Sequence, residues 1–223
     1  MTTPISVTID ESLYQTYPEI RLGLIRFKAI VKEPSEEFWN YMNQKVLPEV
    51  RKNMENKSWA EIEGVRGSRK AYKAFGRDPG RYRVSSEALL RRVRRKDELY
   101  HINSVVDVNN LISVTSGLSV GSYDLDKTKG DIILRKANAG EGYDGIGKKF
   151  LDMENMLMLV DDEGLFGSST SDSTRTMVTD KTTDVLVAIY CFENNIDLEK
   201  LLESAKEAFI KYADAKDITS WII

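Results

Sequence analysis

Two neighbouring amides and a hydroxyl-rich segment are the side chains best suited to chemistry in this sequence. Asn109 and Asn110 follow an acidic residue in an otherwise apolar stretch, and each amide offers both donors and acceptors to a polar ligand. Residues 169–174 consist of Ser and Thr together with one carboxylate, that of Asp172. Groups of this kind bind and orient a polar substrate. Helix-surface amides and a flexible surface loop are the structural alternatives.

The segment Gly164–Gly167 precedes those hydroxyl groups and is expected to form a turn. Glycine lets the backbone approach a ligand closely, so N–H groups in this turn would face a bound ligand. An ordinary hairpin turn is the alternative interpretation.

Single copies of cysteine and histidine exclude several reaction classes. Cys191 excludes an internal disulfide, and its apolar surroundings in residues 185–192 predict a buried core thiol. His101 alone cannot build a His-rich zinc site, and no nucleophile-elbow motif accompanies it for a Ser-His-Asp triad. We therefore expect a structural role for His101 at a loop-to-helix junction, and we expect neither a metal nor another cofactor.

Positive charge is concentrated in residues 66–96. This segment holds twelve Lys and Arg against two acids, a formal charge of +10, so the rest of the chain carries −13 within a net charge of −3. Such asymmetry indicates a polyanionic partner for one face of the protein. The alternative is a solvated helix surface that forms intramolecular ion pairs with the acidic remainder.

Length and composition are those of one globular domain. The chain has 223 residues, of which 41% are hydrophobic, enough to build a core. Its best apolar run, residues 185–192, is too short to cross a membrane, and the first four residues lack the basic and apolar regions of a signal peptide. We expect a cytoplasmic protein without a membrane partner.

Hydrophobic periodicity predicts the elements that must position these groups. Strands are expected at residues 5–9, 25–31, 131–135, 156–160 and 185–192. Helices are expected to begin at Ser35, at Ser58 in a capping box with Glu61, and at Ser85 or Ser86, with further helices around residues 105–112 and 198–212. Because helices and strands are segregated along the chain, an α+β fold is favoured over a doubly wound fold.

Several short motifs between His101 and Phe192 resemble, in order and spacing, the editing (B3/B4) domain of the phenylalanyl-tRNA synthetase β subunit. Residues 102–110 are similar to its Ile-Asn-x-Val-Val-Asp-Val-x-Asn signature, and residues 117–124 to its turn from Gly to an aromatic-Asp pair. The strands and turns that follow in the family are matched by residues 130–137, 140–141, 157–162 and 164–167. Residues 82–93 and 173–179 resemble the form of the domain that stands alone in bacteria.

This resemblance implies a three-layer β/β/α architecture with a mixed sheet and helices on one side. It assigns residues 61–223 to the B3/B4-like domain, with residues 1–60 as an N-terminal strand and helix extension packed on the same domain. The synthetase domain hydrolyses tyrosine mischarged onto the phenylalanine tRNA, so the implied partner is the aminoacylated end of a tRNA and not DNA. The sequence carries no indication of an oligomeric state.

The resemblance also implies roles for individual residues. Asn110 matches the pocket Asn of the family and is expected to orient the substrate in catalysis. Gly121 stands where the family has a pocket His, and the family Glu would fall near Ser169 or Thr170, so neither side chain is matched. The residues expected to bind the substrate are Asn109, Gly121, Ser122, Gly164, Gly167, Ser169, Thr170 and Asp172. Those expected to bind tRNA are Arg66, Arg69, Arg83, Arg91 and Arg92.

Three functions are compatible with this pattern. The first is a trans-acting deacylase that hydrolyses mischarged aminoacyl-tRNA. The others are a non-catalytic module that binds tRNA or an amino-acid-like ligand, and an esterase or amidase for small molecules. The basic segment favours the first two functions, whereas the missing His and Glu favour the last two. Hydrolysis without the His is chemically reasonable, because a pocket that holds water and an activated ester in near-attack geometry accelerates the reaction by positioning.

Overall fold

The central strand of the molecule is β9 (Asp184–Cys191), and every one of its residues is buried. It pairs antiparallel with β2 (Arg21–Lys28) on one side and with β3 (Ser119–Asp124) on the other. A last strand, β10 (Lys216–Ile222), pairs antiparallel with β2, so the sheet has the order β10-β2-β9-β3. The edge strand β3 and the strand beside it, β9, each contribute a tyrosine to the candidate site described below.

A second sheet packs against one face of the first. Its order is β1-β4-β7-β8, and it is mixed, because β1 runs parallel to β4 while the remaining pairs are antiparallel. A short hairpin, β5-β6, lies beside it. The bounds of these strands are β1 Val7–Ile9, β4 Ile132–Lys136, β5 Gly142–Asp144, β6 Phe150–Asp152, β7 Leu157–Asp161 and β8 Gly164–Ser168.

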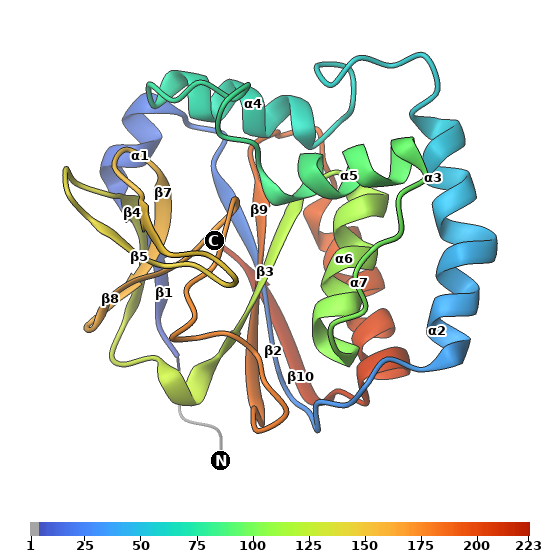
Figure 1. Ribbon diagram of the computed structural model, residues 1–223. Coiled ribbons are helices and arrows are strands. Elements are labelled where there is room, and N and C mark those ends of the chain that lie inside the picture. The colour runs from blue at the N-terminus through green and yellow to red at the C-terminus, as the bar shows by residue number, and fades with distance from the viewer. Residues whose placement is uncertain (1–4) are drawn as a thin grey trace.

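Most of the helices cover the other face of the first sheet, which gives the three layers visible in Figure 1. Two lie elsewhere: α1 (Glu11–Thr16) is beside the second sheet, and α4 (Val65–Ala74) runs across the end of the layers. One hydrophobic core lies between the covering helices and the first sheet, and a second core lies between the two sheets. The helices are α1 Glu11–Thr16, α2 Glu36–Tyr41, a π-helical turn Met42–Val46, α3 Leu47–Asn53, α4 Val65–Ala74, α5 Ser85–Arg95, α6 Ser104–Ser116, a 3-10 turn Leu125–Lys127 and α7 Leu198–Ala213. The predicted α+β fold, three-layer β/β/α with helices on one side, is confirmed.

Local sequence explains where the helices that border the site begin and end. The Asn103 side chain caps α6 by accepting hydrogen bonds from the N–H groups of Val105 and Val106. Gly117 ends α6 with a left-handed conformation, φ 76°, which glycine adopts without steric cost. The Ser35 hydroxyl accepts from the N–H of Phe38 and starts α2 as predicted.

Two local predictions are wrong. The Ser58 and Glu61 side chains do bond to each other, but residues 58–64 form turns, and α4 begins only at Val65 after Gly64 adopts φ 77°. The expected turn at Gly164–Gly167 is strand β8, paired with β7; the turn precedes it at residues 162–163. The segment predicted as a turn is therefore extended backbone at the edge of the second sheet, and one of its N–H groups, that of Ser168, donates to Asp172.

The computed structural model describes residues 5–223, so the expectation about the first four residues lies outside the described part of the chain. Within it, β1 pairs with β4, and β2 lies between β9 and β10. The domain boundary at residue 60 stays a prediction. None of the helices in residues 5–223 combines the length and the apolar character needed to cross a bilayer.

Candidate active site

The candidate site is organised around the buried phenol of Tyr123, on the face of β3 that looks toward the second sheet. The Tyr123 hydroxyl donates to Oδ1 of Asp172 at 3.0 Å and lies 2.9 Å from the Tyr190 hydroxyl. Because Tyr123 has a single proton and gives it to the carboxylate, the Tyr190 hydroxyl donates to Tyr123. A chain of polar groups thus runs from β9 through β3 to the loop that follows β8.

Two glycines make room for this phenol. A Cβ atom at position 121 would stand 2.7 Å from Cζ of Tyr123, and one at position 167 would also overlap the Tyr123 ring. Gly121 and Tyr123 are two residues apart on one strand, so their side chains point to the same face. The space in which a side chain at position 121 would begin is therefore occupied by the Tyr123 phenol.

The loop after β8 is held by its own side chains and by neighbouring elements. The Ser168 hydroxyl accepts from the N–H groups of Thr170 and Ser171, and the Ser168 N–H donates to Oδ1 of Asp172 at 3.2 Å. The Ser169 hydroxyl is 2.6 Å from that of Tyr72 on α4, and the Ser169 carbonyl accepts from the first residue of α5. These hydrogen bonds hold the loop in one conformation, unlike the flexible surface loop that was the alternative interpretation.

Asp172 is the titratable group of this network. Burial raises the pKa of its carboxyl to about 7, against the hydrogen bonds from Ser168 and Tyr123, which lower it. The residue as a whole is only half-buried, and among residues 5–223 no side chain or N–H donates to its second oxygen, Oδ2. Burial also raises the pKa of Tyr72 to about 12 and that of Tyr190 well above its ordinary value, so both phenols stay protonated.

Two further buried polar atoms belong to α6 and to the segment that pairs with the edge of β3. Oδ1 of Asn109 and Oγ1 of Thr176 are buried and have no hydrogen-bond partner among the described residues. Tyr123 pairs with Met177, which places Thr176 opposite Asp124 and on the same face as Ser122. An unsatisfied buried acceptor costs about 1–3 kcal/mol, so these atoms are suited to a donor from a ligand, such as an ammonium group.

The predicted substrate-binding residues therefore fall on two sides of β3. Gly121, Gly167 and Asp172 meet at Tyr123, with Ser169 and Thr170 in the adjoining loop. Asn109 and Ser122 lie on the helical side, and Asn110 is half-buried on α6 with no side-chain hydrogen bond to a described residue. Gly164 is at the far end of β8, about 10 Å from Gly167 at strand spacing.

Comparison with known proteins identifies the family of this arrangement. Residues 67–216 match the B3/4 domain. The chain belongs to the B3/4 domain family. The match includes β3, α6, β8 and the loop with Asp172, so it covers the elements of the site.

The most similar curated relatives of this B3/4 protein include phenylalanine–tRNA ligase β subunits. That of Wolbachia sp. subsp. Brugia malayi is 33% identical over 94 residues, 39% of this chain and 11% of the relative. That of Cutibacterium acnes is 35% identical over 89 residues, 39% of this chain and 10% of the relative. An N-terminal fragment of the phenylalanyl-tRNA synthetase β subunit from Pyrococcus horikoshii superposes with a TM-score of 0.49 and 13% identity, over 99% of this chain and 55% of that chain. The chain spans about a tenth of the length of these curated relatives.

Most of the arginines predicted to bind tRNA have partners within the B3/4 protein. Arg69 and Arg91 both pair with the buried carboxylate of Glu87, at 2.9 and 2.8 Å. Arg66 pairs with the buried Glu193, and Arg92 donates to the carbonyl of Glu98. Arg83 is exposed, with no hydrogen bond or ion pair to a described residue. Many of the cations in residues 66–96 thus form intramolecular ion pairs or hydrogen bonds, as the alternative interpretation predicts. Others, such as Arg83, are exposed at the surface.

Sequence reasoning missed the role of four tyrosines in the network around Asp172 and its loop: Tyr72, Tyr123, Tyr143 and Tyr190. Tyr143 on β5 donates to the carbonyl of Ser171 and so holds the loop from its other side. One signal was available, since a glycine two residues before a tyrosine in a strand predicts that the ring lies across the glycine. The remaining contacts join elements far apart in the chain and carry no local signal.

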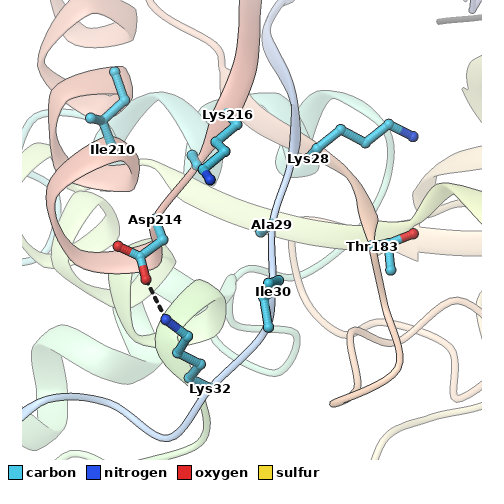
Figure 2. Close-up of a pocket in the computed structure, with 9 residues that line it drawn as sticks. Lys28, Ala29, Ile30, Lys32, Thr183, Ile210, Asp214 and Lys216 are labelled. Atoms are coloured by element: carbon cyan, nitrogen blue, oxygen red, sulfur yellow. Dashed lines mark hydrogen bonds and ion pairs between the residues drawn. The ribbon is translucent and has the colours of Figure 1, made fainter.

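A separate groove lies at the C-terminal end of β2, as Figure 2 shows. It measures about 620 Å³, and its apolar walls include Ile30 and Ile210, both exposed. Lys32 and Asp214 form an ion pair across one side of it. None of the predicted site residues lines this groove.

Proposed function

We propose that this B3/4 protein is a trans-acting hydrolase of aminoacyl-tRNA esters that acts in the cytoplasm, where tRNAs are charged. The observation that carries the proposal is Asp172: a carboxylate with a pKa of about 7, held by two hydrogen bonds to one oxygen, in the loop where the family resemblance places the pocket. A general base is most effective when its pKa lies near the working pH. Similarity to part of the phenylalanine–tRNA ligase β subunits supports an aminoacyl-tRNA as the substrate.

In the proposed mechanism, Oδ2 of Asp172 accepts a hydrogen bond from a water molecule. As the water oxygen adds to the ester carbonyl carbon, Asp172 takes one of its protons. The tetrahedral intermediate then breaks the bond between that carbon and the ribose oxygen, and the proton on Asp172 passes to the leaving ribose oxygen. The products are a free amino acid and a tRNA with a terminal hydroxyl. No covalent intermediate with the protein is formed.

The direct test is to incubate the purified protein with a panel of correctly charged and mischarged aminoacyl-tRNAs and to follow loss of the ester over time. Hydrolysis of at least one member faster than the spontaneous rate is expected. The absence of hydrolysis against the whole panel would refute the proposal.

A non-catalytic binding module is the second candidate, and one observation favours it. The Tyr123 phenol occupies the position from which a side chain at Gly121 would project, and the family His belongs at that position. A pocket without this His is suited to hold an aminoacyl end and leave it intact. Binding of tRNA that weakens steeply with salt, together with stable esters, is the expected result for this candidate.

Asn110→Ala is expected to reduce hydrolysis about ten- to a hundredfold, because loss of one orienting hydrogen bond in the transition state is worth roughly 1.4–2.7 kcal/mol. The measurement is kcat/KM on the best substrate of the panel. Asn195→Ala, at an exposed amide on the segment before α7, is the control and should retain wild-type rates. Equal rates for both variants would show that Asn110 does not contribute to the reaction.

His101→Ala and Cys191→Ser are expected to leave most hydrolysis intact. The His101 ring stacks on Trp39 with centroids 3.7 Å apart, and Cys191 is fully buried in β9, so both have structural surroundings. The measurement is the single-turnover rate of variants whose circular dichroism matches that of wild type. Near-complete loss of activity in well-folded His101→Ala, or an aminoacyl group trapped on Cys191, would contradict the proposed mechanism.

A further inference from the structure

Apart from the candidate site, the structure has a strongly basic hollow of about 440 Å³ where α3 and α5 end side by side. The two helix ends are tied together, because Nε of Arg51 donates to the carbonyl of Val93, and Arg94 donates to the carbonyls of Met54 and Lys57. The hollow is therefore built on a fixed backbone. Its charged lining consists of Arg51, Lys52, Lys57, Arg94, Lys96 and one acid, Glu55.

The positive charge of this hollow is only partly offset within the described protein. Five cations and one carboxylate leave a formal charge of +4, in a chain whose net charge is −3. The C-terminal ends of two helices contribute about half a negative charge each, which leaves about +3. Lys52, Lys57 and Lys96 are exposed and form no ion pair with any residue in 5–223. A cluster of cations that outnumber the carboxylates around them is suited to bind an anion.

The surroundings of the hollow favour a nucleic acid over a small anion. Along α5, the guanidinium groups of Arg91 and Arg94 lie over the Trp59 ring, at 4.4 and 4.0 Å from its centroid. Arg92 lies 4.4 Å over the ring of Tyr100, which is 63% exposed. Single-stranded RNA binds to surfaces of this kind, because cations contact its phosphates while aromatic rings and guanidinium groups stack on its bases.

Helix α5 connects this hollow to the candidate site. Its first residue, Ser85, donates its N–H to the carbonyl of Ser169, and its last residue, Arg95, lies next to Arg94 in the hollow. Eleven residues at 1.5 Å each span about 16 Å. We propose that the basic hollow binds backbone phosphates of a tRNA whose aminoacylated end reaches the candidate site along α5. The identity of that end rests on the proposed function, whereas binding to the hollow does not require hydrolysis.

The test compares two double variants with the same change in net charge. Lys52→Glu/Lys57→Glu reverses two cations of the hollow, and Lys181→Glu/Lys216→Glu reverses two exposed lysines near the other end of the central sheet. Binding of uncharged tRNA is measured by fluorescence anisotropy over a range of salt concentrations. The hollow variant should lose at least tenfold in affinity at low salt, and its salt slope should fall by about 2, one for each phosphate contact. The control should stay within about twofold of wild type.

Three results would overturn the inference. They are wild-type affinity in the hollow variant, an equal loss in the control, which would indicate an effect of net charge alone, and failure of wild type to bind tRNA. Thermal unfolding of both variants verifies that they fold. Loss of binding in the hollow variant alone supports the hollow even if no ester is hydrolysed, in which case the proposed function fails alone. If wild type hydrolyses the ester and the hollow variant binds tRNA as wild type does, the proposed function stands and the inference about the hollow fails.

Discussion

Replacement of Asp172 by Asn is expected to lower the hydrolysis of aminoacyl-tRNA about a hundredfold or more, the scale on which a general base contributes. The amide oxygen of Asn can still accept from Tyr123 and Ser168, so the loop keeps its geometry, but an amide takes no proton from water. The wild-type rate should rise with pH through about 7, as the carboxyl ionises. The variant should lack this rise. The measurement is the pH profile of kcat/KM.

Asp180→Asn, at an exposed carboxylate in the turn before β9, is the matched control and should keep both the rate and the profile. A wild-type profile in Asp172→Asn would show that another group supplies the base. Stability provides a second readout. Because the folded-state pKa of Asp172 lies above the ordinary value of 3.8, its contribution to stability is present below about pH 4 and is lost as pH rises through 7. The free energy of unfolding of the Asn variant minus that of wild type, measured in urea, should therefore be larger at pH 8 than at pH 5.

Gly121→Ala is expected to destabilise the protein by about 1–3 kcal/mol, the usual cost of adding a group to a filled core. The added Cβ would overlap the Tyr123 ring, which is fully buried and bonded to both Tyr190 and Asp172, so the ring has no room to retreat. Urea unfolding measures the change in free energy.

The cause of this cost is tested in a second background. Tyr123→Ala alone should cost about 3–5 kcal/mol, as expected for removal of a large buried aromatic ring. Adding Gly121→Ala to Tyr123→Ala should then cost close to nothing, because the space is free. Gly167→Ala approaches the same ring from β8 and should show the same dependence. An unchanged cost of Gly121→Ala in the Tyr123→Ala background would contradict the proposed conflict and would leave room for a side chain at position 121 beside the phenol.

Local sequence was sufficient for several strands and helices, and its short motifs indicated the family. Strands β4, β7 and β9 and helices α5, α6 and α7 follow from apolar periodicity, and the start of α2 follows from the capping side chain of Ser35, which acts over three residues. The same short range explains the errors. Ser58 and Glu61 form the predicted bonds, yet the backbone turns at Gly64 and no helix follows until α4. Strand β10 was missed because its pairing with β2, nearly two hundred residues earlier, is what makes it a strand.

The composition of the site was decided by tertiary structure. The sequence singled out Gly121 and Asp172, but only the pairing of β3 with β9 and the return of β8 bring Tyr123 and Tyr190 between them. The basic segment was evident from composition, but which of its cations are free depends on remote carboxylates such as Glu193, which takes up Arg66. Periodicity reports which face of an element is apolar, whereas the pKa of a carboxyl and the availability of a cation depend on the groups that folding places around them.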